Sequence, residues 1–120
     1  MYKILAVDDE KLICSVLKQF LANSGFEVLT GSCGQEALNI IEKHDPDLLI
    51  MDKKMPGMDG LAVLEIIRKN GNMIPVILLT GSYSIQESMS GMNKANPVVL
   101  VKPVDLNILL RKVKSLLGDN

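Results

Sequence analysis

Residues 47–60, DLLIMDKKMPGMDG, decide the fold, because an apolar run ends there in an aspartate that is followed by a turn. The run DLLIM (47–51) shows no alternation of polar and apolar residues, which is typical of a strand buried on both faces of a parallel sheet. Asp52 comes next, followed by two lysines, a proline and two glycines. Asp52 is therefore either a turn residue with a local hydrogen bond or a reactive carboxylate at a strand end.

Four more apolar runs are spaced along the chain. They are KILAV (3–7), EVLT (27–30), PVILLT (75–80) and VVLV (98–101). Segments with helical periodicity lie between or after the runs, at 11–25, 34–44, 61–71 and 106–118. In the first of them the predicted apolar stripe consists of Leu12, Val16, Leu17, Phe20 and Leu21. Its final Gly25 suits the position after a helix end.

Residues 84–96 are rich in Ser and Asn, which are weak helix formers, and we expect a short, marginal helix there. The order of elements is then (βα)5. Right-handed crossovers give an α/β, doubly wound, five-stranded parallel sheet with helices on both faces. We expect the flavodoxin-like strand order 2-1-3-4-5. No linker divides the chain, so residues 1–120 are expected to form a single domain.

Composition excludes several classes of function. The net charge is −1 and no run of Lys and Arg is present, which argues against direct nucleic-acid binding. No stretch reaches the ~20 apolar residues of a membrane helix, and the N-terminus lacks the layout of a signal peptide, so we expect a cytoplasmic protein. Cys14 and Cys33 are expected to be reduced thiols. His44 is the only histidine, which leaves little room for a zinc site or a Ser-His-Asp triad.

Polar side chains end or follow the apolar runs, and in a parallel sheet these positions share one edge, where doubly wound folds place their sites. Asp8 and Asp9 follow the first run, and Asp52 follows the third. Thr80 ends the fourth run and Lys102 follows the fifth. If the first and third strands are neighbours, the three aspartates converge, and Thr80 and Lys102 approach them from the other side.

Three carboxylates in one crevice repel one another unless a cation lies among them. Carboxylate oxygens, a main-chain carbonyl and waters are the ligands that Mg²⁺ prefers. With the metal bound, one carboxylate can act as a nucleophile toward phosphorus and form an aspartyl phosphate. The metal, the ammonium group of Lys102 and the hydroxyl of Thr80 would then stabilise the phosphoryl oxygens.

Each residue also has a purely structural explanation. Asp8 and Asp9 could cap the first helix, and Asp52 could belong to an Asx-type turn. Thr80 could simply end a strand, and Lys102 could be a surface charge. We favour the chemical interpretation, because matching residues at four strand ends are an improbable coincidence.

Together these motifs resemble the receiver domain of two-component response regulators. They are DD (8–9), DKKMPGMDG (52–60), which matches D-x-x-M-P-x-x-x-G, LLTG (78–81) and KP (102–103). The likeness extends from Tyr2 to about Leu117. Either DD or KP alone is a weak signal, but the four motifs in this order and spacing are specific.

The resemblance implies that Asp52 accepts a phosphoryl group from a sensor histidine kinase or a histidine phosphotransfer protein. Asp9 and Asp52 would bind Mg²⁺ directly, with Mn²⁺ as an alternative. The main-chain carbonyl of Lys54 would be a further ligand, and Asp8 would act through water. We expect Asp52 to be exposed, so that a donor can reach it.

The resemblance also implies that Thr80 and Lys102 contact the phosphoryl group and that the Lys102–Pro103 bond is cis. Such a domain catalyses only its own phosphorylation and dephosphorylation and is not otherwise an enzyme. It is a monomer or a phosphorylation-dependent dimer that does not contact membranes. Its output is an unknown partner or an effector domain, and the chain is either a stand-alone receiver or part of a longer regulator.

One departure from the family's pattern concerns how the signal would be transmitted. The family usually has Tyr or Phe where this chain has Val99, a short side chain that cannot transmit a change through a large ring rotation. Tyr83 could supply a substitute ring. We therefore expect phosphorylation to reorder the segment 81–96, whose weak helix formers predict low local stability.

Other functions fit the sequence less well. A haloacid-dehalogenase-like phosphatase needs a D-x-D motif after the first strand and a cap insertion, and neither VDDEK nor a length of 120 residues offers them. A missing Asp, Thr or Lys at the acceptor site would favour a receiver fold that serves only as an interaction module, but all are present. Nucleotide binding would need a glycine-rich phosphate loop, and none follows any predicted strand.

Overall fold

The computed structural model describes residues 1–81 and 97–118. Its five strands form one sheet in the order β2-β1-β3-β4-β5, with every neighbouring pair parallel. The strands are β1 (Lys3–Val7), β2 (Glu27–Gly31), β3 (Leu48–Asp52), β4 (Val76–Thr80) and β5 (Val98–Val101). The predicted flavodoxin-like order is confirmed, and each strand starts and ends within one residue of its predicted bounds.

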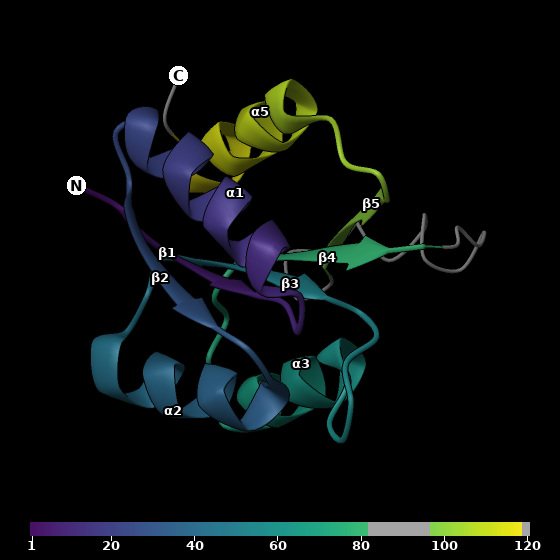
Figure 1. Cartoon of the computed structure of the whole chain (residues 1–120). Helices are drawn as coiled ribbons and strands as arrows, with labels where there is room; N and C mark the ends of the chain where they lie inside the picture. The colour runs from purple at the N-terminus through teal and green to yellow at the C-terminus, as the bar shows by residue number, and fades with distance from the viewer. Residues whose placement is uncertain (82–96, 119–120) are drawn as a thin grey trace.

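Helices cover both faces of the sheet (Figure 1). One face carries α1 (Lys11–Asn23) and α5 (Leu106–Leu117), and the other carries α2 (Gly34–His44) and α3 (Gly60–Lys69). The helix predicted at 84–96 lies outside the described residues. Among those that are described, no helix is long and apolar enough to cross a membrane.

Two apolar clusters fill the space between the sheet and its helices, one on each face, and alternate residues of β1, β3 and β4 belong to one or the other. On the α1 and α5 side the helices contribute the fully buried Leu17, Leu21, Leu109 and Val113. On the other side α2 and α3 contribute Ala37, Ile41, Val63 and Ile67. All residues of β3 and β4 are buried. The prediction of burial on both faces fails for β2 and β5, because edge strands have a neighbour on one side only.

The apolar stripe predicted for α1 is partly wrong. Leu12 is 74% exposed and Val16 is 43% exposed, whereas Cys14, Leu17 and Leu21 are buried. Apolar residues surround this helix on more than one side, so periodicity alone could not identify the buried face. The end of α1 is as predicted, since Gly25 adopts a positive φ of 99°.

Candidate functional site

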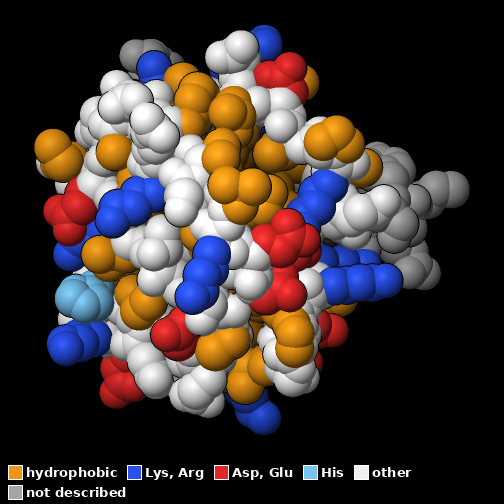
Figure 2. Space-filling view, in the orientation of Figure 1, with side chains coloured by type: hydrophobic (Ala, Val, Ile, Leu, Met, Phe, Trp, Pro, Cys, Tyr) orange, Lys and Arg blue, Asp and Glu red, His pale blue; other side chains and the backbone are white. Residues whose placement is uncertain are grey.

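The sheet topology brings the three predicted aspartates together. Val7 of β1 pairs with Met51 of β3, so the residues that follow them, Asp8 and Asp52, stand on adjacent strands. One carboxylate oxygen from each of Asp8, Asp9 and Asp52 lies within 4.8 Å of the others. Asp8 and Asp52 are buried, whereas Asp9 is exposed. Figure 2 shows acidic side chains gathered beside lysine or arginine side chains near the start of α1.

The Asp8 carboxyl group is buried but only half satisfied. Its Oδ1 accepts a hydrogen bond from the N–H of Glu10 at 2.9 Å. Its Oδ2 is buried and has no hydrogen-bond partner among the described residues. Burial raises the pKa of Asp8, against the opposing effects of the Glu10 N–H and the charge of Lys102. The capping explanation for this aspartate fails, because Glu10 holds the N-cap position of α1 and no side chain caps the helix.

The main chain at Asp8 is held by neighbours that the sequence did not suggest. Its N–H donates to the carbonyl of Gly31 in β2 at 3.1 Å. The thiol of Cys14 donates to the carbonyl of Asp8, with a sulfur–oxygen distance of 3.4 Å. Burial raises the pKa of the Cys14 thiol, so it stays protonated as a donor. Cys14 therefore helps to hold the main chain at the end of β1 through this hydrogen bond. A lone cysteine in the sequence gives no signal of such a role.

Asp52 is only 6% exposed, so the expectation that it is exposed is wrong. It ends β3, the middle strand of the sheet, and Lys102 reaches over it from β5. Its Oδ1 accepts a hydrogen bond from the N–H of Lys54 at 3.3 Å, which is the Asx-type contact of the structural explanation. Its Oδ2 accepts one from Lys102 Nζ at 2.8 Å. The turn contact and the charged contact therefore coexist on one carboxylate.

Lys102 is a member of the site and not a solvated surface charge. Its Nζ forms ion pairs with Asp52 Oδ2 at 2.8 Å and with Asp8 Oδ2 at 3.8 Å. Burial lowers the pKa of Lys102, but the hydrogen bond and charge of Asp52, with the charges of Asp8 and Glu10, outweigh burial and raise it. The ammonium group of Lys102 thus interacts with the negative charges of three carboxylates, those of Asp52, Asp8 and Glu10. The remaining negative charge, and an Asp8 Oδ2 that accepts no hydrogen bond from the described residues, fit a hard divalent cation with oxygen ligands.

Thr80 ends β4, which lies in the sheet between β3, where Asp52 stands, and β5, which Lys102 follows. Thr80 is 2% exposed and comes directly after Leu79, which pairs with Asp52. Its carbonyl accepts a hydrogen bond from the N–H of Lys102 at 2.7 Å. The Lys102–Pro103 peptide bond is cis, as predicted.

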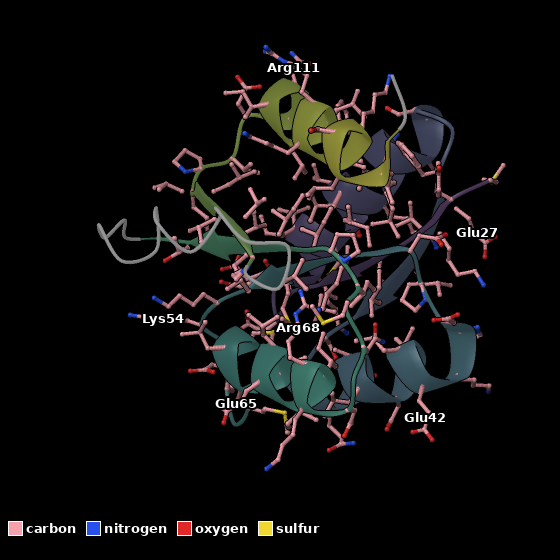
Figure 3. All side chains as sticks on the ribbon, turned by 180° about the vertical axis from the view of Figure 1, so that it is seen from behind. Glu27, Glu42, Lys54, Glu65, Arg68 and Arg111 are labelled. Carbon is pink, nitrogen blue, oxygen red and sulfur yellow. The ribbon has the colours of Figure 1, made fainter. Side chains whose placement is uncertain are left out.

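The remaining predicted residues are less closely tied to the site. Lys54 is exposed, and its side chain projects away from the domain at the edge where the strands end (Figure 3). Its carbonyl as a metal ligand stays a prediction. Val99 is half-buried in β5, where it pairs with Leu78. Tyr83 and the expected rearrangement of 81–96 fall on a segment of which only residue 81 is described.

Comparison with known proteins agrees with this geometry. The family model for the response regulator receiver domain matches residues 4–114. The response regulator MprA of Mycobacterium leprae is 35% identical over 115 residues, which cover 96% of this chain and 50% of that protein. The chain thus spans about half the length of the curated relatives it matches.

Solved structures are similar over nearly the whole chain. The receiver domain of a Francisella response regulator has a TM-score of 0.90 at 30% identity and covers 98% of both chains. The response regulator TrrA of Thermotoga maritima, solved in complex with Mg²⁺ and BeF, has a TM-score of 0.81 at 38% identity, covering 97% of this chain and 99% of TrrA. With its fold, its acidic site and its motifs in the family's order, the chain belongs to the response regulator receiver domain family.

Proposed function

We propose that Asp52 is the phosphoacceptor of a two-component phosphorelay and takes its phosphoryl group from a histidine kinase or a histidine phosphotransfer protein. The observation that carries the proposal is the buried carboxylate pair, Asp8 and Asp52, which shares one ammonium group and leaves Asp8 Oδ2 without a hydrogen bond among the described residues. A purely structural acidic group would have its hydrogen bonds completed by the protein.

The transfer is a displacement at phosphorus. An oxygen of Asp52 forms a bond to phosphorus while the phosphorus–nitrogen bond of the donor phosphohistidine breaks, and the electron pair of that bond stays on the imidazole nitrogen. Asp9, Asp52 and the carbonyl of Lys54 would hold Mg²⁺, with Asp8 acting through water. Bound Mg²⁺ supplies positive charge that offsets the charge of the carboxylates and of the phosphoryl oxygens.

Lys102 and Thr80 would stabilise the oxygens of the phosphoryl group that Asp52 accepts. Lys102 Nζ already lies 2.8 Å from Asp52 Oδ2, so small movements suffice for it to donate to a new phosphoryl oxygen. The Thr80 hydroxyl belongs to the adjacent strand end and would donate to another. The low exposure of Asp52 limits the access of water, which would slow hydrolysis of the aspartyl phosphate.

The phosphorylated surface would be read by a downstream partner or by an effector domain, since the curated relatives are about twice as long as this chain. We infer that residues 1–120 form one receiver domain. It would work in the cytoplasm as a monomer or as a dimer formed on phosphorylation. It would turn over no substrate other than its own phosphoryl group.

Intact-mass measurement tests this proposal. The protein is incubated with acetyl phosphate and Mg²⁺, and we expect the mass of one phosphoryl group to be added. Chelation of the metal should prevent the addition, and Asp52→Asn should abolish it without unfolding the domain. Phosphorylation of the Asp52→Asn variant at undiminished stoichiometry would contradict the assignment.

A further inference from the structure

Two glycines lie against the loop at 53–59, which runs from the end of β3 to the start of α3 (Figure 1). Gly60 is the first residue of α3. A Cβ atom at this position would stand 2.6 Å from the carbonyl oxygen of Asp52 and 3.1 Å from the Cα of Lys53. The first of these distances is far below a van der Waals contact, and both neighbours are main-chain atoms that cannot turn aside. The start of α3 therefore packs directly on the main chain of Asp52.

Gly34, the first residue of α2, makes a similar approach from another side. Its Cβ atom would stand 2.9 Å from both the Cβ and the carbonyl oxygen of Met58, and 3.0 Å from Cγ2 of Val63. Met58 belongs to the loop at 53–59, so the loop is enclosed by α2 and by α3. Gly34 is separated from this loop in sequence by β3, and no motif identifies it.

These two glycines differ from those the chain uses for backbone conformation. Gly57 and Gly71 have positive φ angles of 80° and 83°, and no described heavy atom other than those of adjacent residues lies within 4 Å of a Cβ built on either. Gly34 and Gly60 are absent from the positive-φ glycines. At those two positions the lack of a side chain provides space and not conformational freedom.

The contact at Gly60 reaches the reacting group through the main chain. The N–H of Gly60 donates to the carbonyl of Lys53 at 2.8 Å, and the N–H of Lys53 donates to the carbonyl of Leu79 at 2.8 Å. The main chain that follows Asp52 is thus fixed between β4 and α3. A displacement of the Asp52 carbonyl would carry the carboxylate of the same residue away from Lys102 Nζ, 2.8 Å distant.

We propose that Gly60 and Gly34 are positioning residues for the Asp52 site. Gly60 sets where the Asp52 carboxylate stands relative to Lys102, and Gly34 sets the position of the loop that carries Lys54. This inference rests on the proposed phosphoacceptor function. Gly60 acts on the nucleophile, so its replacement is expected to change the phosphorylation rate at saturating Mg²⁺. Gly34 acts on the loop, so its replacement is expected to change the Mg²⁺ concentration that the reaction requires.

The test compares three alanine variants for phosphorylation rate by acetyl phosphate, for Mg²⁺ affinity and for thermal stability. Gly60→Ala should lower the rate at saturating Mg²⁺ by about tenfold or more, since a misplacement of about 1 Å can cost roughly a hundredfold. Gly34→Ala should mainly raise the Mg²⁺ concentration required for half-maximal rate. Gly71→Ala, at the other end of α3, is the matched control. It should lower the melting temperature and leave the other two quantities unchanged.

A purely structural role would lower the melting temperatures of all three variants and leave rate and metal affinity as in the parent, which would overturn the proposal. If the parent itself takes no phosphoryl group, the proposed function fails, and the Mg²⁺ affinities still test the positioning. If Gly60→Ala does not fold, amide exchange in the parent decides. The Gly60 N–H should exchange as slowly as those of β3, and exchange at the rate of an exposed loop would overturn the close approach.

Discussion

Two carboxyl groups near the ends of the neighbouring strands β1 and β2 have opposite surroundings. Glu36, in the first turn of α2, is exposed, and its Oε1 accepts from the N–H of Ser32 at 2.6 Å and from the Ser32 hydroxyl at 2.5 Å. These hydrogen bonds lower the pKa of Glu36. Asp8 is 1% exposed, its Oδ2 has no hydrogen-bond partner among the described residues, and burial raises its pKa.

The ionised carboxylate of Glu36 stabilises the fold, whereas the ionised carboxylate of Asp8 destabilises it. Glu36 is ionised and satisfied by its own loop, so its charge helps to join β2 to α2. Asp8 is desolvated beside another carboxylate, and Lys102 Nζ at 3.8 Å offsets its charge only in part, so the charge opposes folding unless a further cation binds. Sites that bind cations are expected among acids of the second kind.

The largest expected effect on stability follows from removing the ammonium group of Lys102, which pairs with both Asp52 and Asp8. Lys102→Met leaves Asp8 and Asp52 facing each other, and we expect the free energy of unfolding in metal-free buffer to fall by about 1–2 kcal/mol. That is less than a fully buried pair would lose, because Lys102 is 30% exposed. Added Mg²⁺ should restore more stability to the variant than to the parent. Chemical denaturation with and without Mg²⁺ measures both, and equal gains would contradict the electrostatic explanation.

The next effect distinguishes the two acids that follow β1. Asp9→Asn should weaken Mg²⁺ binding by about a hundredfold and Asp8→Asn by about tenfold, because a direct ligand contributes more than one that acts through water. Calorimetric titration of each variant measures the two affinities. A larger loss in Asp8→Asn would reverse the assigned ligand roles.

Asp8→Asn should also stabilise the metal-free protein by about 1 kcal/mol at neutral pH, because it relieves a buried, half-satisfied charge. The folded chain binds the Asp8 proton more tightly than the unfolded chain does. The parent therefore loses stability as pH rises from the ordinary value of 3.8 through the raised pKa. The advantage of the variant should grow over that window and vanish below it. Denaturation across a pH series measures the difference, and a constant difference would contradict the cause.

Glu36→Gln should have the smallest effect and the opposite sign. The pKa of Glu36 is lowered in the folded state, so its contribution is present above the ordinary value of 4.5 and is lost as pH falls through the lowered pKa. The variant should be slightly less stable than the parent at neutral pH and equal to it in acid. Ser32→Ala is the control, since it removes one of the two donors and should reproduce part of the loss. A pH-independent difference would point to packing instead.

The sequence sufficed for the parts of the structure that depend on strand order. Five apolar runs gave the sheet, and residues at the strand ends then converged by geometry, as Asp8, Asp9 and Asp52 do. The cis bond before Pro103 came from the family resemblance and is present. Each of these properties follows from short stretches that can be identified in isolation.

Properties that depend on what covers a residue were not predictable in the same way. Asp52 was expected to be exposed, but it ends the middle strand of the sheet and is contacted by Lys102, 50 positions later in the chain. The exposure of Leu12 and Val16 follows from which side of α1 meets the sheet, and apolar residues on several sides left that open. The close approach of Gly34 was missed because a missing side chain carries no periodic signal. Gly60 ends the motif at 52–60, but the motif alone does not show that the main chain of Asp52 lies against it.

The edge position of β5 has a consequence for when the site exists during folding. Val98, Val99 and Leu100 are only partly buried, and β5 pairs with β4 alone. Among the strands at whose ends the described site residues lie, β5 is therefore expected to open locally most readily. Because Lys102 follows this strand, each local opening separates the lysine from Asp52 while the carboxylates on β1 and β3 stay in place. The chain must also close a loop of 50 residues before that lysine arrives. Under the proposed phosphoacceptor function, holding a phosphoryl group would therefore require that β5 is docked on β4.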